Sequence, residues 1–181
     1  MKKISTSQKG FTLLEAVFVM ALTAMVGAVV FGITRAGNQQ NNARETRMTL
    51  QDNAREGLYK MVQEIRQSGP TKITLGAGTI QFSVPDPSSL TTGTGYALNW
   101  AGAHTIKYSV GGTNGTQILR LDMTTNKTAV IANDVTSAAF TGNGGLTVIT
   151  VTLNVQHTTP EGRQIPATPL SLVAQAEVRN H

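Results

Sequence analysis

The sequence contains no cysteine and few aromatic (5%) or charged (14%) residues. Without cysteine, the chain can form no disulfide, no thiolate metal site and no thiol nucleophile. Hydrophobic residues make up 40% of the 181 residues, which is enough for a folded core and excludes a chain that is disordered throughout. The formal net charge of +5 would suit a nucleic-acid partner. Its meaning depends on where the charges lie.

Most of the positive excess lies in the first ten residues, where Lys2, Lys3 and Lys9 occur without any acidic residue. The run from Phe11 to Ile33 that follows has one charge, on Glu15. As a helix this run would be about 35 Å long, enough to cross a hydrocarbon core of about 30 Å. Basic residues before a span favour a cytoplasmic N-terminus. The sequence therefore predicts one membrane-inserting helix, with the rest of the chain outside the cytoplasm.

A helical pattern continues beyond this run. Residues 35–67 are polar and contain no proline, and no small-residue cleavage site of a secretory signal separates them from the span. Apolar residues form one helical stripe: Ala54, Leu58, Met61, Val62 and Ile65. Ser68-Gly69-Pro70 predicts the helix end. We expect one helix over residues 11–67, whose apolar half protrudes from the domain on which its second half packs.

The charges of residues 35–67 are mixed, which favours a solvated helix face over a nucleic-acid patch. Glu56 and Lys60 have the favourable spacing for an ion pair within a helix. Gly37 and Gly57 are predicted weak points of the helix, each costing about 1 kcal/mol relative to alanine.

From Thr71 onwards, short β-rich runs alternate with Gly, Asn and Pro turns. The predicted strands are Thr71–Leu75, Thr79–Val84, Tyr96–Trp100, His104–Val110, Thr116–Met123, Ala129–Ala132, Ser137–Thr141, Leu146–Val155 and Leu170–Val178. Residues 111–115 and 143–145 are predicted turns, and 85–95 and 158–169 predicted loops. The alternation slips at Ile149-Thr150, which suggests a bulge. The predicted fold class is α+β, a long N-terminal helix packed on an antiparallel β-sheet domain.

The most specific feature is the order of residues where the leader meets the apolar run. Lys9-Gly10-Phe11-Thr12-Leu13-Leu14-Glu15 resembles the N-terminal signal of the type IV pilin and pseudopilin family. The resemblance implies cleavage by a prepilin peptidase between Gly10 and Phe11, and N-methylation of Phe11. It also implies that Glu15 meets the N-terminal amine of a neighbouring subunit during assembly. A carboxylate near hydrocarbon is costly unless paired, which agrees with such a role.

This resemblance divides the chain into four parts. They are a leader (1–10), a hydrophobic transmembrane and filament-core helix (11–34), an amphipathic continuation (35–69) and a β-rich pilin head (70–181).

A looser resemblance covers the downstream region. Residues 118–120, 130–137, Phe140, the long apolar strand and residues 178–180 are similar to the minor pilin W and pseudopilin J group. Two departures from the wider family accompany it. Gly32 lies about where many pilins have a helix-kinking proline, so local melting of the helix is less assured. Major pilins commonly close a C-terminal loop with a disulfide, which this chain cannot form, and this favours a minor subunit.

No pattern in the sequence predicts catalysis. His104, His157 and His181 have no second ligand at helical spacing, so we expect no metal site, no cofactor and no enzyme. The glycine pairs of residues 76–78 and 93–95 lack a Walker lysine and are interpreted as turns. The loop at residues 86–89 has oxygen ligands but not the pattern of a calcium loop.

The sequence therefore predicts a minor pilin or pseudopilin that assembles into or primes a type IV pilus or a type II secretion pseudopilus. The expected partners are other pilin subunits, the prepilin peptidase, the inner-membrane assembly platform and the lipid bilayer. The alternative is a membrane-anchored adhesin or DNA-uptake receptor that does not polymerise. DNA binding has weak support, because the region from Thr71 has six basic and five acidic residues without a cluster. Trp100 and Tyr108 could stack on bases or pack in the core.

Overall fold

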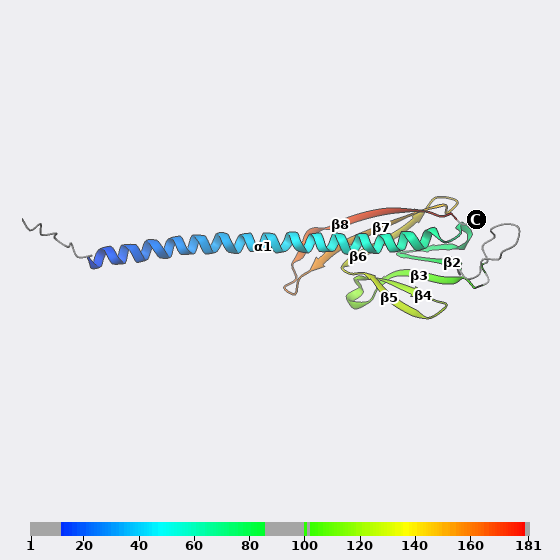
Figure 1. Ribbon diagram of the computed structural model, residues 1–181, viewed down its shortest axis with the longest axis horizontal. Helices are drawn as coiled ribbons and strands as arrows, with labels where there is room; N and C mark the ends of the chain where they lie inside the picture. The colour runs from blue at the N-terminus through cyan, green and yellow to red at the C-terminus, as the bar shows by residue number, and fades with distance from the viewer. Residues whose placement is uncertain (1–11, 86–99, 101, 180–181) are drawn as a thin grey trace, which may run out of the picture. The chain divides into compact units, whose positions relative to one another are not determined.

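The computed structural model describes residues 12–85, 100 and 102–179 (Figure 1). The chain forms two compact units, one up to Asn42 and one from Ala43, which are described separately. Helix α1 (Leu13–Arg66) contributes to both of them. The predicted helix over residues 11–67 is confirmed within the described residues, and Phe11 lies outside them.

The described part of the first unit is the beginning of α1. Every described residue from Thr12 to Asn42 is exposed except Ala16, which is half-buried. In soluble proteins a helix with apolar side chains on all faces is normally buried. A helix of this composition therefore needs lipid or other helices around its exposed surface.

In the second unit, α1 buries one face. The buried residues are Leu50, Ala54, Gly57, Leu58, Met61, Val62 and Ile65. All five residues of the predicted stripe are among them, which confirms the helical period. The helix ends at Arg66, just before Ser68-Gly69, and a short 3-10 turn, η1 (Pro70–Lys72), leads into the strands.

The strands form two antiparallel sheets, where the sequence pattern had predicted one. The first sheet has the order β1 (Ile73–Gly76), β2 (Thr79–Val84), β3 (His104–Gly111), β4 (Gln117–Asp122) and β5 (Lys127–Ala132). The second has the order β6 (Val135–Gly142), β7 (Val148–Thr158) and β8 (Gln164–Glu177). Only Asn133 and Asp134 separate β5 from β6, and Asp134 has a φ of 56°. This left-handed residue redirects the chain, so that β6 pairs with β7 instead of β5.

Several local predictions can be compared with these strands. The predicted turn at residues 111–115 contains η3 (Thr113–Gly115), which connects β3 to β4. The predicted turn at residues 143–145 lies between β6 and β7. The predicted loop over 158–169 is too long, because β8 already begins at Gln164. The predicted strand 96–100 and loop 85–95 lie mostly outside the described residues, and Trp100 itself is not in a strand.

The predicted bulge at Ile149-Thr150 is wrong. Ile149, Val151, Leu153 and Val155 are all buried and alternate without a slip. The pairing of β7 with β8 shifts instead between Val155 and His157, where Val155 and Gln156 are both buried. The sequence pattern misled because Val148 is apolar although it lies on the half-exposed face.

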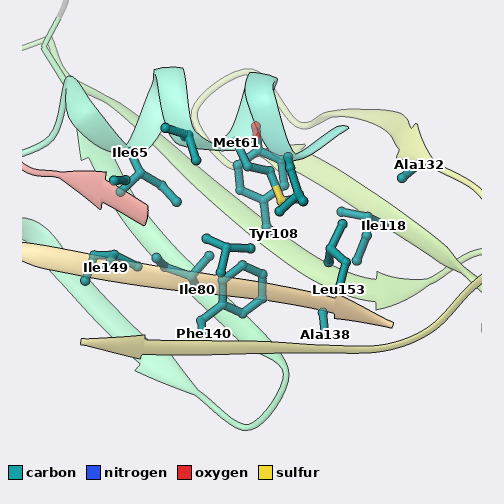
Figure 2. Packing of buried hydrophobic residues seen from close by; sticks show 14 of the residues in the cluster. Met61, Ile65, Ile80, Tyr108, Ile118, Ala132, Ala138, Phe140, Ile149 and Leu153 are labelled. Atoms are coloured by element: carbon teal, nitrogen blue, oxygen red, sulfur yellow. The ribbon is translucent and has the colours of Figure 1, made fainter. Parts of the chain in front are cut away.

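The core joins α1 to both sheets, as Figure 2 shows for its labelled residues. Met61 and Ile65 come from α1, Ile80 and Tyr108 from the first sheet, and Phe140, Ile149 and Leu153 from the second. The rings of Phe82 and Tyr108 stack with centroids 5.9 Å apart. Burial of each large apolar side chain of this core contributes about 1.5–3 kcal/mol to the stability of the fold. The second half of α1 is thus an integral layer of the head.

Candidate functional site

The start of α1 has the geometry of a capped helix. Thr12 precedes the first helical residue, and its Oγ1 accepts a hydrogen bond from the backbone N of Glu15 at 3.3 Å. This is the contact that an N-cap threonine makes. Thr12 and Glu15 also have the S/T-x-x-E spacing of a capping box. A carboxylate in the first turn is further stabilised by the helix dipole.

Glu15 is exposed and forms no ion pair within the residues that the structure describes. It is the only acidic residue between Thr12 and Asn42. Gly10 and Phe11, the predicted cleavage residues, lie outside the described residues. Cleavage between them and pairing of Glu15 with an amine therefore remain predictions.

The surface around Glu15 is apolar on every side. Exposed large hydrophobic side chains in this part of α1 are Leu13, Leu14, Val17, Phe18, Val19, Met20, Leu22, Met25, Val26, Val29, Val30, Phe31 and Ile33. The hydroxyls of Thr23 and Thr34 donate to the backbone oxygens of Val19 (2.7 Å) and Val30 (2.9 Å). Polar groups satisfied inside the helix are what a lipid environment requires. By length and composition, α1 could cross a membrane.

In the head, a polar network fixes α1 on the first sheet. Glu64 of α1 accepts hydrogen bonds from the hydroxyl of Tyr108 (2.8 Å) and from Nε of Arg120 (2.9 and 3.0 Å). Burial, reinforced by the charge of Glu64, raises the pKa of Tyr108 far above its ordinary value. Burial disfavours the charge of Arg120, but its bond to Glu64 outweighs this and raises the pKa of the guanidinium. The network thus joins a neutral phenol to a stable ion pair.

The sequence analysis missed this network, because it placed Glu64 among the charges of a solvated face. A signal was available: Glu64 lies three residues after Met61 and one before Ile65, directly beside the apolar stripe. Tyr108 is fully buried, so of its two predicted uses the structure shows core packing and not base stacking.

Two of the three histidines each pair with an aspartate. Nδ1 of His104 lies 3.1 Å from Oδ2 of Asp122, and Nδ1 of His157 lies 3.1 Å from Oδ1 of Asp134. The pairs join β3 to β4 and β7 to the turn before β6. No group of three or more potential metal ligands occurs in the part of the chain that the structure describes. His181 lies outside that part.

The remaining predicted motifs are local turns or fall outside the description. Residues 77–78 form the turn between β1 and β2, as predicted. The glycine pair at 93–95 and the loop at 86–89 lie outside the described residues. The candidate site is therefore the start of α1.

The fold, one long N-terminal helix packed on antiparallel sheets, is a pilin-like α+β fold. Residues 5–31 match the family model of the prokaryotic N-terminal methylation motif. The match supports a structural subunit of the type IV pilin and pseudopilin family, and it fits a single-pass protein anchored in the inner membrane. The comparisons with curated proteins and with solved structures gave no match.

Proposed function

We propose that this chain is a minor pilin or pseudopilin that assembles into, or primes, a type IV pilus or a type II secretion pseudopilus. The observation that carries the proposal is a helix exposed and apolar on every face, with a single carboxylate in its first turn, inside the matched methylation motif. A helix of this composition needs lipid or other helices around it. Storage in the membrane would first surround the helix with lipid. Packing with other subunits would later surround it with helices.

Processing is proposed to act at the start of this helix. The leader, residues 1–10, carries Lys2, Lys3 and Lys9, and these favour its cytoplasmic location. The prepilin peptidase would cut between Gly10 and Phe11, and Phe11 would then be N-methylated. Cutting there removes the basic leader but retains residues 11–34 as the anchor. The head, residues 70–181, would lie outside the cytoplasm. The assembly platform would later extract the subunit from the membrane.

Glu15 is proposed to act in assembly through its charge. An unpaired carboxylate within a low-dielectric helix bundle is unfavourable, and an amine nearby would offset that cost. Cleavage creates such an amine on Phe11. A subunit whose Glu15 meets the Phe11 amine of a neighbour gains this pairing only in one register, so the pair would also set the position of the incoming helix.

The lack of cysteine and the similarity to the W and J group support a minor rather than a major subunit. The alternative, an adhesin or DNA receptor that never polymerises, needs the apolar span but neither cleavage after Gly10 nor Glu15. The burial of Tyr108 removes one of the two aromatic residues that DNA could have used.

Mass analysis of the protein's N-terminus tests the proposal. The protein is isolated from membranes and from filaments sheared off the cells. We expect the mature chain to begin at a methylated Phe11 in both fractions. An N-terminus at Met1, or one beyond Ile33, would contradict the processing. A chain that begins at Phe11 but purifies neither with sheared filaments nor with other pilin subunits would favour the non-polymerising alternative.

A further inference from the structure

Each of the two sheets has two edge strands, β1 and β5 in the first and β6 and β8 in the second. Within the described residues, β5 pairs only with β4, and β8 pairs only with β7. The unpaired N–H and C=O groups of an edge strand can pair with a strand of another chain. Proteins normally protect long edges with charges, prolines or a covering element.

The outward groups of β8 follow from its pairing with β7. The N of Val178 donates to the O of Thr147 at 2.8 Å, and the register continues without a shift to Val155 and Leu170. Bonded pairs alternate along an antiparallel ladder. The backbone groups of Ser171, Val173 and Gln175 therefore face away from β7. Pro166 and Pro169 lie before this stretch, so the open edge begins at Ser171.

The outward groups of β5 follow from the pairing of β4 with its two neighbours. The N of Met123 donates to the O of Thr105 at 2.8 Å, so alternate residues of β4, among them Leu121, face β3. Asp122 and Arg120 then face β5, where their partners are Lys127 and Ala129. The backbone groups of Thr128 and Val130 are consequently directed outward. Within the described chain, no hydrogen bond reaches the outward groups of β5 or β8.

Each open edge presents one exposed valine among polar outward-pairing residues, which are Thr128 on β5 and Ser171 and Gln175 on β8. Val130 is 49% exposed and Val173 is 61% exposed, and each occupies an outward-pairing position. The charges of the two strands are opposite in sign and lie at their ends. Lys127 begins β5, and Glu177 ends β8, with no other charge in either strand. An antiparallel alignment of β5 with β8 would bring these two charges to the same end of the ladder.

The arrangement of the head suits such an alignment. Figure 1 shows the β4–β5 hairpin and the β7–β8 hairpin at opposite ends of the head, so that β5 and β8 run in opposite directions. A groove of about 430 Å³ lies beside β8. Its lining is mostly apolar and includes Leu58, Tyr59 and Val62 of α1 and residues 172–174 of β8. The groove leaves space beside the open edge for an added strand.

We propose that β5 of one copy of this chain adds to β8 of a second copy as an antiparallel strand. In this register Val130 lies opposite Val173, and Thr128 opposite Gln175. The inference rests on the proposed function in one respect, because subunits of a filament all point the same way. Strands that run oppositely within one head then meet as antiparallel partners in neighbouring heads. Such a contact is head-to-tail, because it uses different strands of the two copies, and two neighbouring copies are enough to form it.

Cysteine cross-linking tests the register, because the natural chain contributes no thiol. Full-length Thr128→Cys and Gln175→Cys chains are coexpressed, and membranes and sheared filaments are oxidised. Directly opposite residues have Cα atoms about 5.5 Å apart, which suits a disulfide. Ser171→Cys is the matched control on the same edge and face, displaced by about 13 Å. We expect a cross-linked dimer with Gln175→Cys and only background with Ser171→Cys. Equal dimer with both, or dimer with neither, would overturn the proposal.

A second pair of variants tests the edge without thiols. Val173→Lys places a charge at the proposed contact, and Thr152→Lys places the same charge on the adjacent strand, opposite Val173 but away from the edge. In the Thr128→Cys and Gln175→Cys background, we expect Val173→Lys to abolish the dimer and Thr152→Lys to retain it. Retention with both would overturn the proposal. Filaments that contain the chain without the dimer would refute only this inference. Dimer in membranes without any filament would instead refute the proposed function.

Discussion

The side chain of Arg120 on β4 reaches the carboxylate of Glu64 on α1, with Nε 2.9 Å from Oε1 and 3.0 Å from Oε2. The two residues are 56 positions apart in the sequence, and their side chains are 26% and 29% exposed. Tyr108 donates to the same carboxylate. This network ties the second half of α1 to the first sheet of the head.

Arg120→Met should destabilise the head by about 1–3 kcal/mol, because it leaves Glu64 partly buried without its cation. Denaturant unfolding of the detergent-solubilised protein measures the change. Lys60→Met is the matched control, since the Lys60–Glu56 pair is exposed to solvent and its loss should change the stability little. Equal effects of the two substitutions would show that the network does not fix the helix.

Gly57→Ala should also destabilise the head, although alanine is the better helix former. A Cβ at Gly57 would lie 3.0 Å from Cβ of Ala132 and 3.3 Å from the O of Ile131. Overpacking costs about 1–3 kcal/mol, against a gain of about 1 kcal/mol in helix propensity. Gly37 has nothing within 4 Å of such a Cβ, so Gly37→Ala should leave head unfolding unchanged. A Gly57→Ala protein as stable as the wild type would contradict this reading of the close approach.

We expect the free energy of unfolding of the head to fall in acid, because Asp122 becomes protonated. Burial raises the pKa of this carboxyl, but hydrogen bonds from His104, Thr125 and Thr124 outweigh burial and bring the pKa to about 2, from an ordinary value of 3.8. A pKa lowered by folding contributes stability above 3.8, and that stability is lost as the pH falls from 3.8 towards 2. The whole contribution is on the order of 2 kcal/mol.

Unfolding measured between pH 7 and pH 2 checks this prediction. Asp122→Asn should lower stability at pH 7 and flatten the loss between pH 4 and pH 2. Asp52→Asn, a change of an exposed carboxylate on α1, should keep the acid-induced loss. An unchanged acid profile in Asp122→Asn would show that another group is responsible.

Substitutions at Glu15 and Thr12 should show whether Glu15 acts through its charge or through the capping box. Glutamine can still occupy the third position of a capping box but carries no charge. If Glu15 acts by charge, Glu15→Gln and Glu15→Ala should both insert into membranes and both be missing from sheared filaments. Thr12→Val removes the capping hydroxyl, at a cost of about 1 kcal/mol, and should still assemble. Normal incorporation of Glu15→Gln would exclude the charge-pairing role.

Local pattern was sufficient for the helix and for many strand positions. The stripe from Ala54 to Ile65 has one period, and Ser68-Gly69-Pro70 interrupts it, so both the buried face and the end of α1 could be predicted. The turn at residues 111–115 was equally clear. Each of these features depends on neighbours within one or two turns of chain, which a sequence window contains.

Features that depend on distant partners were not visible. The register of β7 with β8 shifts between Val155 and His157 rather than at Ile149, because residues 166–169 of β8 lie between the partners of these two residues. The division into two sheets follows from a two-residue turn at Asn133-Asp134. The local sequence pattern predicts that Glu64 is a surface charge. Glu64 fixes α1 on the first sheet only because Tyr108 of β3 and Arg120 of β4 donate hydrogen bonds to it.

The expected behaviour of the first 33 residues follows from their own sequence. A basic leader, one carboxylate and an uninterrupted apolar run predict membrane insertion and processing, since this prediction depends on composition and order along a single helix. The head is different. Which strand edges stay open, and which polar side chains meet across α1, depend on residues that are far apart in sequence and come together only when the core is packed.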